Sequence, residues 1–253
     1  MRAISLQSGS NGNCIYVEAG RVKLLFDAGI CGIEAARRLA AQGRDIREVD
    51  GVIISHDHAD HVRYAGVYQR KYGLPLYITP RTLERADARH RLGILRKVNF
   101  FFAGGTLDFG TVSVRTVPTP HDAIDGAVFI VESDGKRLGV MTDLGHPFDE
   151  LHALLPTLDG VFIESNYDPE MLKHGPYPAV LKRRIKGTAG HISNEEAAAL
   201  LKASPRLRWA CLAHLSEQNN TPRLALETHR SVLGPGLSLH VAARYHASAP
   251  LCL

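Results

Sequence analysis

The sequence of 253 residues lacks any apolar run near the roughly 20 residues that a membrane-spanning helix needs. Its first residues, MRAISLQSGSNGN, are not a basic segment followed by a long apolar one, as in a secretory signal. The four cysteines are far apart and form no CxxC pair, which argues against a zinc ribbon or a disulfide framework. There is no internal repeat and no low-complexity tract. We therefore expect a cytoplasmic protein without membrane contact, folded as a single domain over residues 1–253.

Charge is nearly balanced, with 30 Lys and Arg against 26 Asp and Glu, so the net charge of +4 permits contact with a polyanion without requiring it. The apolar content of 45% is enough for a substantial core. The 13 histidines are more informative. Imidazoles clustered beside carboxylates usually bind metals or transfer protons.

Hydrophobic patterns and turn residues predict many strands with helices between them. Strands are expected at residues 2–7, 14–18, 22–26, 49–55, 76–79, 112–117, 127–132, 137–141, 160–165 and 207–213. Helices are expected at 34–42, 62–72 and 194–202 and after Thr221, with a capping box formed by Ser193 and Glu196. Residues 168–189 are interrupted by Pro, Gly and His and are predicted to form a long loop beside the substrate. This order favours an α/β (α+β) fold of two packed sheets with helices outside, an αββα sandwich.

The segment Ser55–His61, with the sequence SHDHADH, stands where an apolar strand ends and a helix begins. In extended backbone, side chains two positions apart point the same way, so His56 and His58 can bind one ion together. Asp60 and His61 lie at the turn into the helix and can face a second ion. Grouping these residues without a cation would carry a large desolvation penalty, so the segment indicates a metal site.

More distant ligands are expected at the ends of other predicted strands. His121, Asp143 and His214 each follow the C-terminal end of a strand. A single histidine at such a position is more often a hydrogen-bonded surface residue. The shared edge of the sheets favours all three as parts of one site.

The order HxHxDH, then a His, an Asp and a last His, resembles the metallo-β-lactamase superfamily. The resemblance implies that one ion is held by His56, His58 and His121, and the other by Asp60, His61 and His214, with Asp143 bridging both. The lactamases have Cys where this chain has Asp143, whereas phosphodiester hydrolases have Asp, so an antibiotic-degrading enzyme is not expected.

Segments along the whole chain are similar to the bacterial YycJ/WalJ family. They are SGSNGN at 8–13, ESNYD at 164–168, GPYP at 175–178, GHISNEEAA at 190–198 and LAHLSEQNN at 212–220. The resemblance implies a 5′-to-3′ exonuclease acting on double-stranded DNA. The β-CASP domain of related ribonucleases is not expected, because only 71 positions separate Asp143 from His214.

Substrate contacts are expected on the C-terminal half. In the related ribonucleases a Gly-His segment contacts the scissile phosphate, which transfers this role to His191. His191 and Ser193 also precede a helix, whose start attracts phosphate, although Ser193 fits a purely capping role better. Lys182 lies in a basic run that is either a solvated helix face or a track for a nucleic-acid backbone. Asn166 is a further candidate contact.

Two divalent ions roughly 3.5 to 4 Å apart would lower the pKa of a bridging water towards 7, giving a metal-activated hydroxide. The expected ions are Zn²⁺, or Mn²⁺ or Fe²⁺, which accept the same ligands. Asp60 would orient the nucleophile, and His191 would stabilise the transition state. Asp27 is expected to contact the metal ligands from behind. The alternatives are a hydrolase of a small phosphodiester or thioester with the same fold, a non-catalytic nucleic-acid-binding module and an oxygen-reducing di-iron protein.

Overall fold

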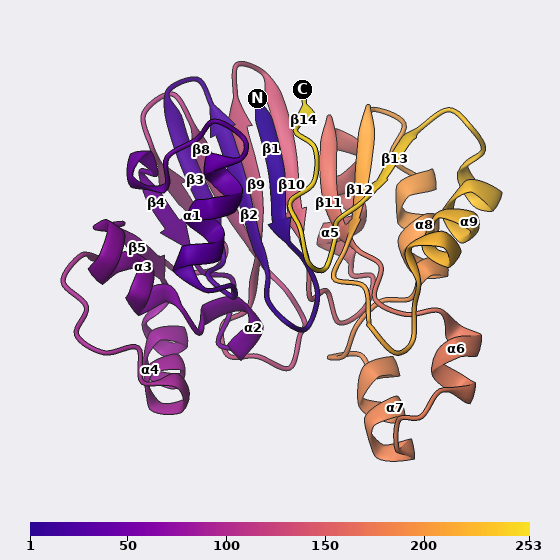
Figure 1. The fold of residues 1–253 in the computed structure, drawn as a ribbon. Helices are drawn as coiled ribbons and strands as arrows, with labels where there is room; N and C mark the ends of the chain where they lie inside the picture. Colours follow the sequence, from indigo (N-terminus) through magenta and orange to yellow (C-terminus); the bar gives the residue numbers. More distant parts are fainter.

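Two seven-stranded sheets pack face to face in the computed structural model, which describes residues 1–253 (Figure 1). The first sheet has the order β14 (Leu251–Cys252), β1 (Arg2–Gln7), β2 (Cys14–Ala19), β3 (Val22–Phe26), β4 (Gly51–Ile53), β5 (Leu76–Ile78) and β6 (Val98–Phe100). The second has the order β13 (Ser238–Val241), β12 (Trp209–Ala213), β11 (Gly160–Glu164), β10 (Lys136–Met141), β9 (Ala127–Ser133), β8 (Ser113–Pro118) and β7 (Thr106–Asp108). Phe26 of the first sheet and Phe129 of the second meet in the core between them, with ring centroids 5.2 Å apart.

Helices cover both outer faces, so the predicted αββα sandwich is confirmed. The first sheet is covered by α1 (Gly32–Ala40), α2 (Ala59–Val62), α3 (Ala65–Tyr72) and α4 (Pro80–His90), and a 3₁₀ turn spans Ile46–Glu48. The second is covered by α5 (Asp149–Leu154), α8 (Asn194–Lys202) and α9 (Pro222–Leu233), with a 3₁₀ turn at Leu155–Thr157. Two more helices, α6 (Pro169–His174) and α7 (Ala179–Lys186), project beyond the strand ends (Figure 1). None of the helices combines the length and apolar character needed to cross a bilayer.

Parallel pairing brings the ends of the central strands to one edge. In the first sheet β3, β4, β5 and β6 run parallel, and in the second β10, β11, β12 and β13 do so. Both β8 and β10 pair antiparallel with β9, so they point the same way. Loops that follow these strands therefore meet at one end of the sandwich, between α4 and α7 in Figure 1.

The predicted loop at residues 168–189 is wrong, because this segment forms α6 and α7. Two of its three prolines begin helices: Asp168 caps α6 with a bond from Met171 N, Pro169 takes the first helical position, and Pro178 is the cap residue of α7. Proline is tolerated at these positions because the first turn has no intrahelical use for its missing N–H.

The helix predicted at residues 62–72 is broken into α2 and α3. The carbonyls of Asp60 and His61 accept bonds from Asn13 N and Ala28 N, both at 2.7 Å, so they do not continue a helix. Gly29 makes this approach possible, since a Cβ there would lie 1.6 Å from the Asp60 carbonyl oxygen. The break fixes the α2 segment, with its two metal-ligand candidates, against the start of β2 and the end of β3.

Candidate active site

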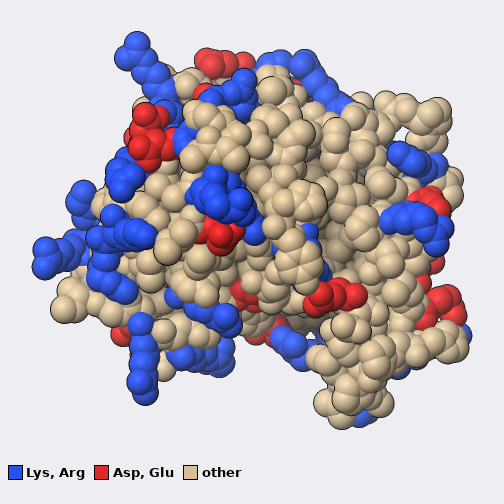
Figure 2. Space-filling model, viewed as in Figure 1, with Lys and Arg blue, Asp and Glu red and all other residues tan.

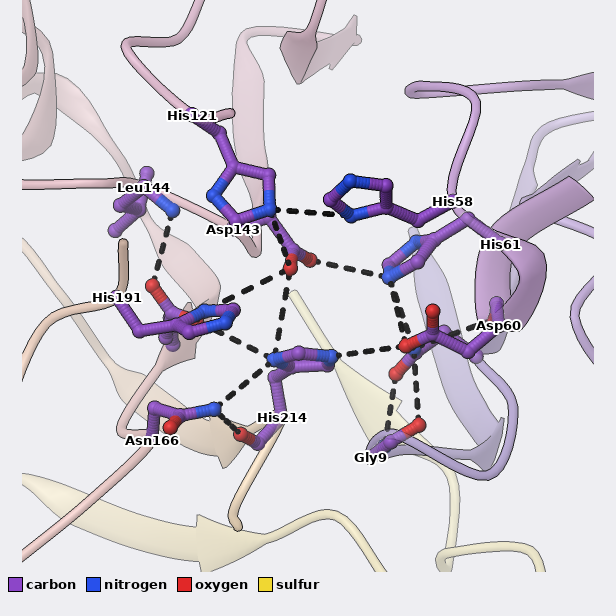
Figure 3. A network of polar contacts seen from close by, with 12 residues as sticks. Gly9, His58, Asp60, His61, His121, Asp143, Leu144, Asn166, His191 and His214 are labelled. Carbon is purple, nitrogen blue, oxygen red and sulfur yellow. Dashed lines mark hydrogen bonds and ion pairs between the residues drawn. The ribbon is translucent and has the colours of Figure 1, made fainter. Parts of the chain in front are cut away.

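The seven metal-ligand candidates converge at the edge where the strands end, and Figure 3 labels all of them except His56. His56 and His58 follow β4, and Asp60 and His61 lie in α2. His121 follows β8, Asp143 follows β10, and His214 follows β12. The predicted juxtaposition of these segments is therefore present in the structure.

The donor atoms form overlapping groups in which all atoms lie within 4.8 Å of one another. One group is His56, His58 and His121, a second is Asp60, His61 and His214, and a third is His56, His61 and Asp143. The Asp143 carboxylate lies between the first two groups, with Oδ1 3.5 Å from His121 Nε2 and Oδ2 3.1 Å from His61 Nε2. This arrangement offers two adjacent cation sites joined by one carboxylate.

Two buried atoms in this cluster make no hydrogen bond: His56 Nε2 and Asp143 Oδ2. Buried polar atoms normally make hydrogen bonds, so an imidazole nitrogen and a carboxylate oxygen that make none, the oxygen 3.1 Å from His61 Nε2, fit a metal ligand set. Imidazole and carboxylate are also the donors that zinc, manganese and iron accept. The residues present thus fit divalent cations.

The far sides of the imidazoles are fixed by hydrogen bonds. Asp27 Oδ2 lies 2.7 Å from His61 Nδ1. The Asp27 carboxylate also accepts a hydrogen bond from Ser55 Oγ, and this hydroxyl lies 2.9 Å from His56 Nδ1. His121 Nδ1 donates to the carbonyl of Gly190 at 2.7 Å. Such partners set the ring orientation and leave the opposite nitrogen for a metal. The position of Asp27 agrees with its predicted supporting contact.

Three non-glycine residues of the site have left-handed backbone: Asp27, Asp143 and His214, with φ of 66°, 59° and 55°. Non-glycine residues in this region are uncommon and cost roughly 1 to 3 kcal/mol each. Asp27 and His214 stand directly after a strand, and Asp143 stands two positions after one. The fold thus accepts local strain where the side chains of the cluster must converge.

Glu164, the last residue of β11, was missed as a functional residue because it ends an apolar run that reads as a plain core strand. Its buried carboxylate accepts from His191 Nδ1 at 2.7 Å and from Leu144 N at 2.9 Å. It also lies 3.3 Å from His214 Nδ1. Glu164 therefore holds both the predicted phosphate ligand His191 and a metal-ligand candidate. A charged residue closing an apolar strand was the signal that could have found it.

Electrostatic interactions in the cluster are strong. Burial alone would raise the pKa of Glu164, but the imidazoles of His191 and His214 lower it to about 2. Burial alone would lower the pKa of His214, but Asp143, Asp60 and Glu164 raise it to about 10. For His56 burial prevails, and together with the neighbouring His61 it holds the pKa well below the usual range. The carboxylates thus favour positive charge at the centre, which a proton or a metal cation can supply.

The cluster opens into a pocket of about 290 Å³. We call its metal-ligand candidates with Glu164 and His191 the floor, and Arg89, His90 and Arg184 the rim, because these three line the same pocket. Arg89 Nη1 donates to Asp57 Oδ2 at 2.7 Å, and Arg184 makes two bonds to Asp122, at 2.6 and 3.0 Å. Both rim arginines stay about half exposed, at 45% and 50%.

Of the predicted substrate contacts, only His191 lines this pocket. Asn166 is buried and donates to the His214 carbonyl at 2.8 Å, and Ser193 closes the capping box of α8. The Lys182 ammonium donates to the Lys173 carbonyl, from α7 to α6, at 2.8 Å. For these three residues substrate contact stays a prediction, and their positions give each a structural role.

Comparisons with known proteins find related sequences and similar folds. The family described as "Beta-lactamase superfamily domain" matches residues 23–214. The chain is 35% identical over 224 residues to Exodeoxyribonuclease WalJ of Streptococcus pneumoniae, covering 87% of this chain and 83% of that protein. It is 34% identical over 251 residues to Exodeoxyribonuclease YycJ of Bacillus anthracis, covering 97% and 94%. The solved structure of Zn²⁺-bound PqqB from Methylobacterium extorquens is similar in fold, with a TM-score of 0.75 at 18% identity and complete coverage of both chains.

Proposed function

The chain belongs to the β-lactamase superfamily, and we propose that it is a dinuclear metal-dependent phosphodiesterase that degrades double-stranded DNA from 5′ ends. The observation that carries the proposal is the convergence of five imidazoles and two carboxylates, among them a His56 nitrogen and an Asp143 oxygen that make no hydrogen bond. The exodeoxyribonuclease names of the two relatives support DNA as the substrate.

We propose two divalent ions, Zn²⁺ or Mn²⁺ or Fe²⁺. His56, His58 and His121 would hold one, Asp60, His61 and His214 the other, and Asp143 would contact both. Such a pair activates water and neutralises charge on a phosphate. Four free cysteines support a reducing compartment, which we take to be the cytoplasm.

The chain's own residues would then orient the substrate and move protons. Burial alone would raise the pKa of Asp60, but His61 and His214 hold it well below its usual range, so this carboxylate accepts a hydrogen bond from the attacking water. His191 is fixed through Nδ1 by Glu164, which leaves Nε2 to donate to a phosphate oxygen or to the departing oxygen. The Glu164 carboxylate stabilises the positive charge on His191 that such donation requires.

The test is incubation of metal-reconstituted protein with linear duplex DNA labelled separately at each end, with Mn²⁺ and Zn²⁺ compared. Mononucleotides released first from the 5′ ends are the expected products. Release from 3′ ends would contradict the polarity. Cleavage of small phosphodiesters or thioesters without cleavage of any nucleic acid would instead favour the small-substrate hydrolase.

A further inference from the structure

The positive charge of the chain is concentrated in two segments that flank the pocket. Residues 63–97, which we call the α4 arm, hold nine Lys or Arg and two Asp or Glu. Residues 168–186, which we call the α7 arm, hold five Lys or Arg and two Asp or Glu. Outside the two arms, the chain holds 16 basic and 22 acidic residues. All nine basic side chains of the α4 arm are exposed. A protein of net charge +4 therefore presents two basic arms on an otherwise acidic body.

Helix α4 carries a row of arginines that leads into the pocket. Arg81, Arg85 and Arg89 are four residues apart and so share one helix face. Arg81 pairs with Asp125 at 2.8 Å, and Arg85 and Arg89 share the single carboxylate of Asp57 at 3.6 and 2.7 Å. The two carboxylates leave the row with excess positive charge, and each guanidinium has further N–H donors. The Asp57 link also ties this row to the metal-binding segment, because Asp57 stands between His56 and His58.

The same arm carries a second basic hollow, of about 460 Å³, lined by Arg70, Arg96 and Lys97. Only Ile94 among its lining residues is apolar. Figure 2 shows Lys and Arg gathered on the left of the view, where Figure 1 places α3 and α4. The basic surface of the α4 arm thus extends from the pocket rim well beyond the space that a small substrate would fill.

We propose that the arginine row of α4 binds the phosphate backbone of duplex DNA next to the scissile phosphate. Eight residues of helix measure about 12 Å, over which one DNA strand presents roughly three to four phosphates, so each of the three guanidiniums has a phosphate within reach. This inference rests on the proposed nuclease function and locates the part of the surface that distinguishes a polymer from a small phosphodiester. The contacts are to phosphates and carry no sequence preference.

The test compares the double variant R81Q/R85Q with the wild-type holoenzyme. Arg81 and Arg85 do not line the pocket. The Michaelis constant for a linear duplex of about 40 base pairs should rise roughly 10-fold, and the slope of log affinity against log salt should fall by about 1.8 for two lost phosphate contacts. Hydrolysis of bis(p-nitrophenyl) phosphate, measured in the same preparations, reports whether fold and metal sites are intact.

The matched control is R223Q/R230Q, which removes two exposed arginines from α9. It should leave the duplex Michaelis constant and the salt slope unchanged. An equal effect of both double variants would reduce the proposal to general charge attraction and overturn it. Normal duplex degradation by R81Q/R85Q would overturn the docking surface alone, whereas a wild-type protein that neither binds nor cleaves DNA would overturn the nuclease function as well.

Discussion

The floor and the rim of the pocket differ in the burial of their side chains and in how those side chains are held. On the floor, side chains such as Asp143 and His214 are buried and fixed by neighbours, and part of the backbone is left-handed. On the rim, Arg89 and Arg184 are half exposed and each is oriented by one carboxylate. Rigid, desolvated groups suit bond cleavage, because electrostatic interactions are strong where water is excluded. Exposed cations suit the capture of a charged polymer, since the interaction is long-ranged and salt-dependent.

The largest expected loss of activity comes from a substitution in the floor. Asp60→Asn should lower kcat by roughly 10³- to 10⁴-fold, because the amide cannot accept a proton or provide a full charge to a cation. Turnover of end-labelled duplex DNA measures the loss, and circular dichroism checks the fold. Unchanged turnover in a folded variant would contradict the role of Asp60.

Glu164 tests whether catalysis depends on residues of the floor other than the metal ligands. Glu164→Gln should lower kcat by roughly 10²-fold, because His191 loses the carboxylate that stabilises its charge. His191→Ala should lower kcat by roughly 10²- to 10³-fold with the metal content retained. The double variant should be little worse than His191→Ala if both residues act as one unit. Additive losses, or loss of metal from His191→Ala, would give these residues separate roles or place His191 among the ligands.

Substitutions on the rim should change the Michaelis constant more than kcat. Arg184→Gln should raise the Michaelis constant for duplex DNA roughly 5- to 10-fold with little change in kcat, since a charge-assisted phosphate contact is lost. Lys182→Gln is the neighbouring control on α7, because Lys182 does not line the pocket. A larger effect of Lys182→Gln than of Arg184→Gln would restore Lys182 as the main contact of this arm.

The smallest expected effect is on stability and alkylation, where the buried thiols should differ from the exposed one. Burial raises the pKa of Cys14 to about 12 and raises that of Cys211 further, whereas Cys252 is exposed. A thiol kept neutral by folding stabilises the protein fully below its unfolded pKa, and this contribution is lost as pH rises. The free energy of unfolding should therefore fall above about pH 8.5, by about 2 kcal/mol per buried thiol near pH 10. Iodoacetamide at about pH 8 should modify Cys252 and spare Cys14 and Cys211 until the protein unfolds, as measured by mass spectrometry.

Much of the fold follows from local sequence signals. The expected bounds of β1, β3 and α8 agree with the structure, since alternating apolar residues and the Ser193 capping box act within a few positions. Helix α4 was missed although Thr79 and Pro80 form the same cap-and-proline start that was recognised at Thr221 and Pro222. The residues of α4 are mostly polar, because the helix covers the sheet with few side chains and presents arginines to solvent.

The candidate site was predictable where its residues are adjacent in sequence or end successive strands. His56 to His61 lie in one short segment, and the structure brings His121, Asp143 and His214 to them. The pairings of Glu164 with His191 and of Arg89 with Asp57 were not predictable, since they join segments 27 and 32 positions apart through side-chain geometry alone. Only the packed structure determines which acid meets which base.

Metal content measured together with metal position tests the central claim most directly. Elemental analysis of the purified protein, combined with anomalous diffraction from its crystals, should find two divalent ions per chain, one at His56, His58 and His121 and one at Asp60, His61 and His214, with Asp143 touching both. A metal-free protein that still cleaves DNA, or ions bound elsewhere with these side chains pointing apart, would contradict the account.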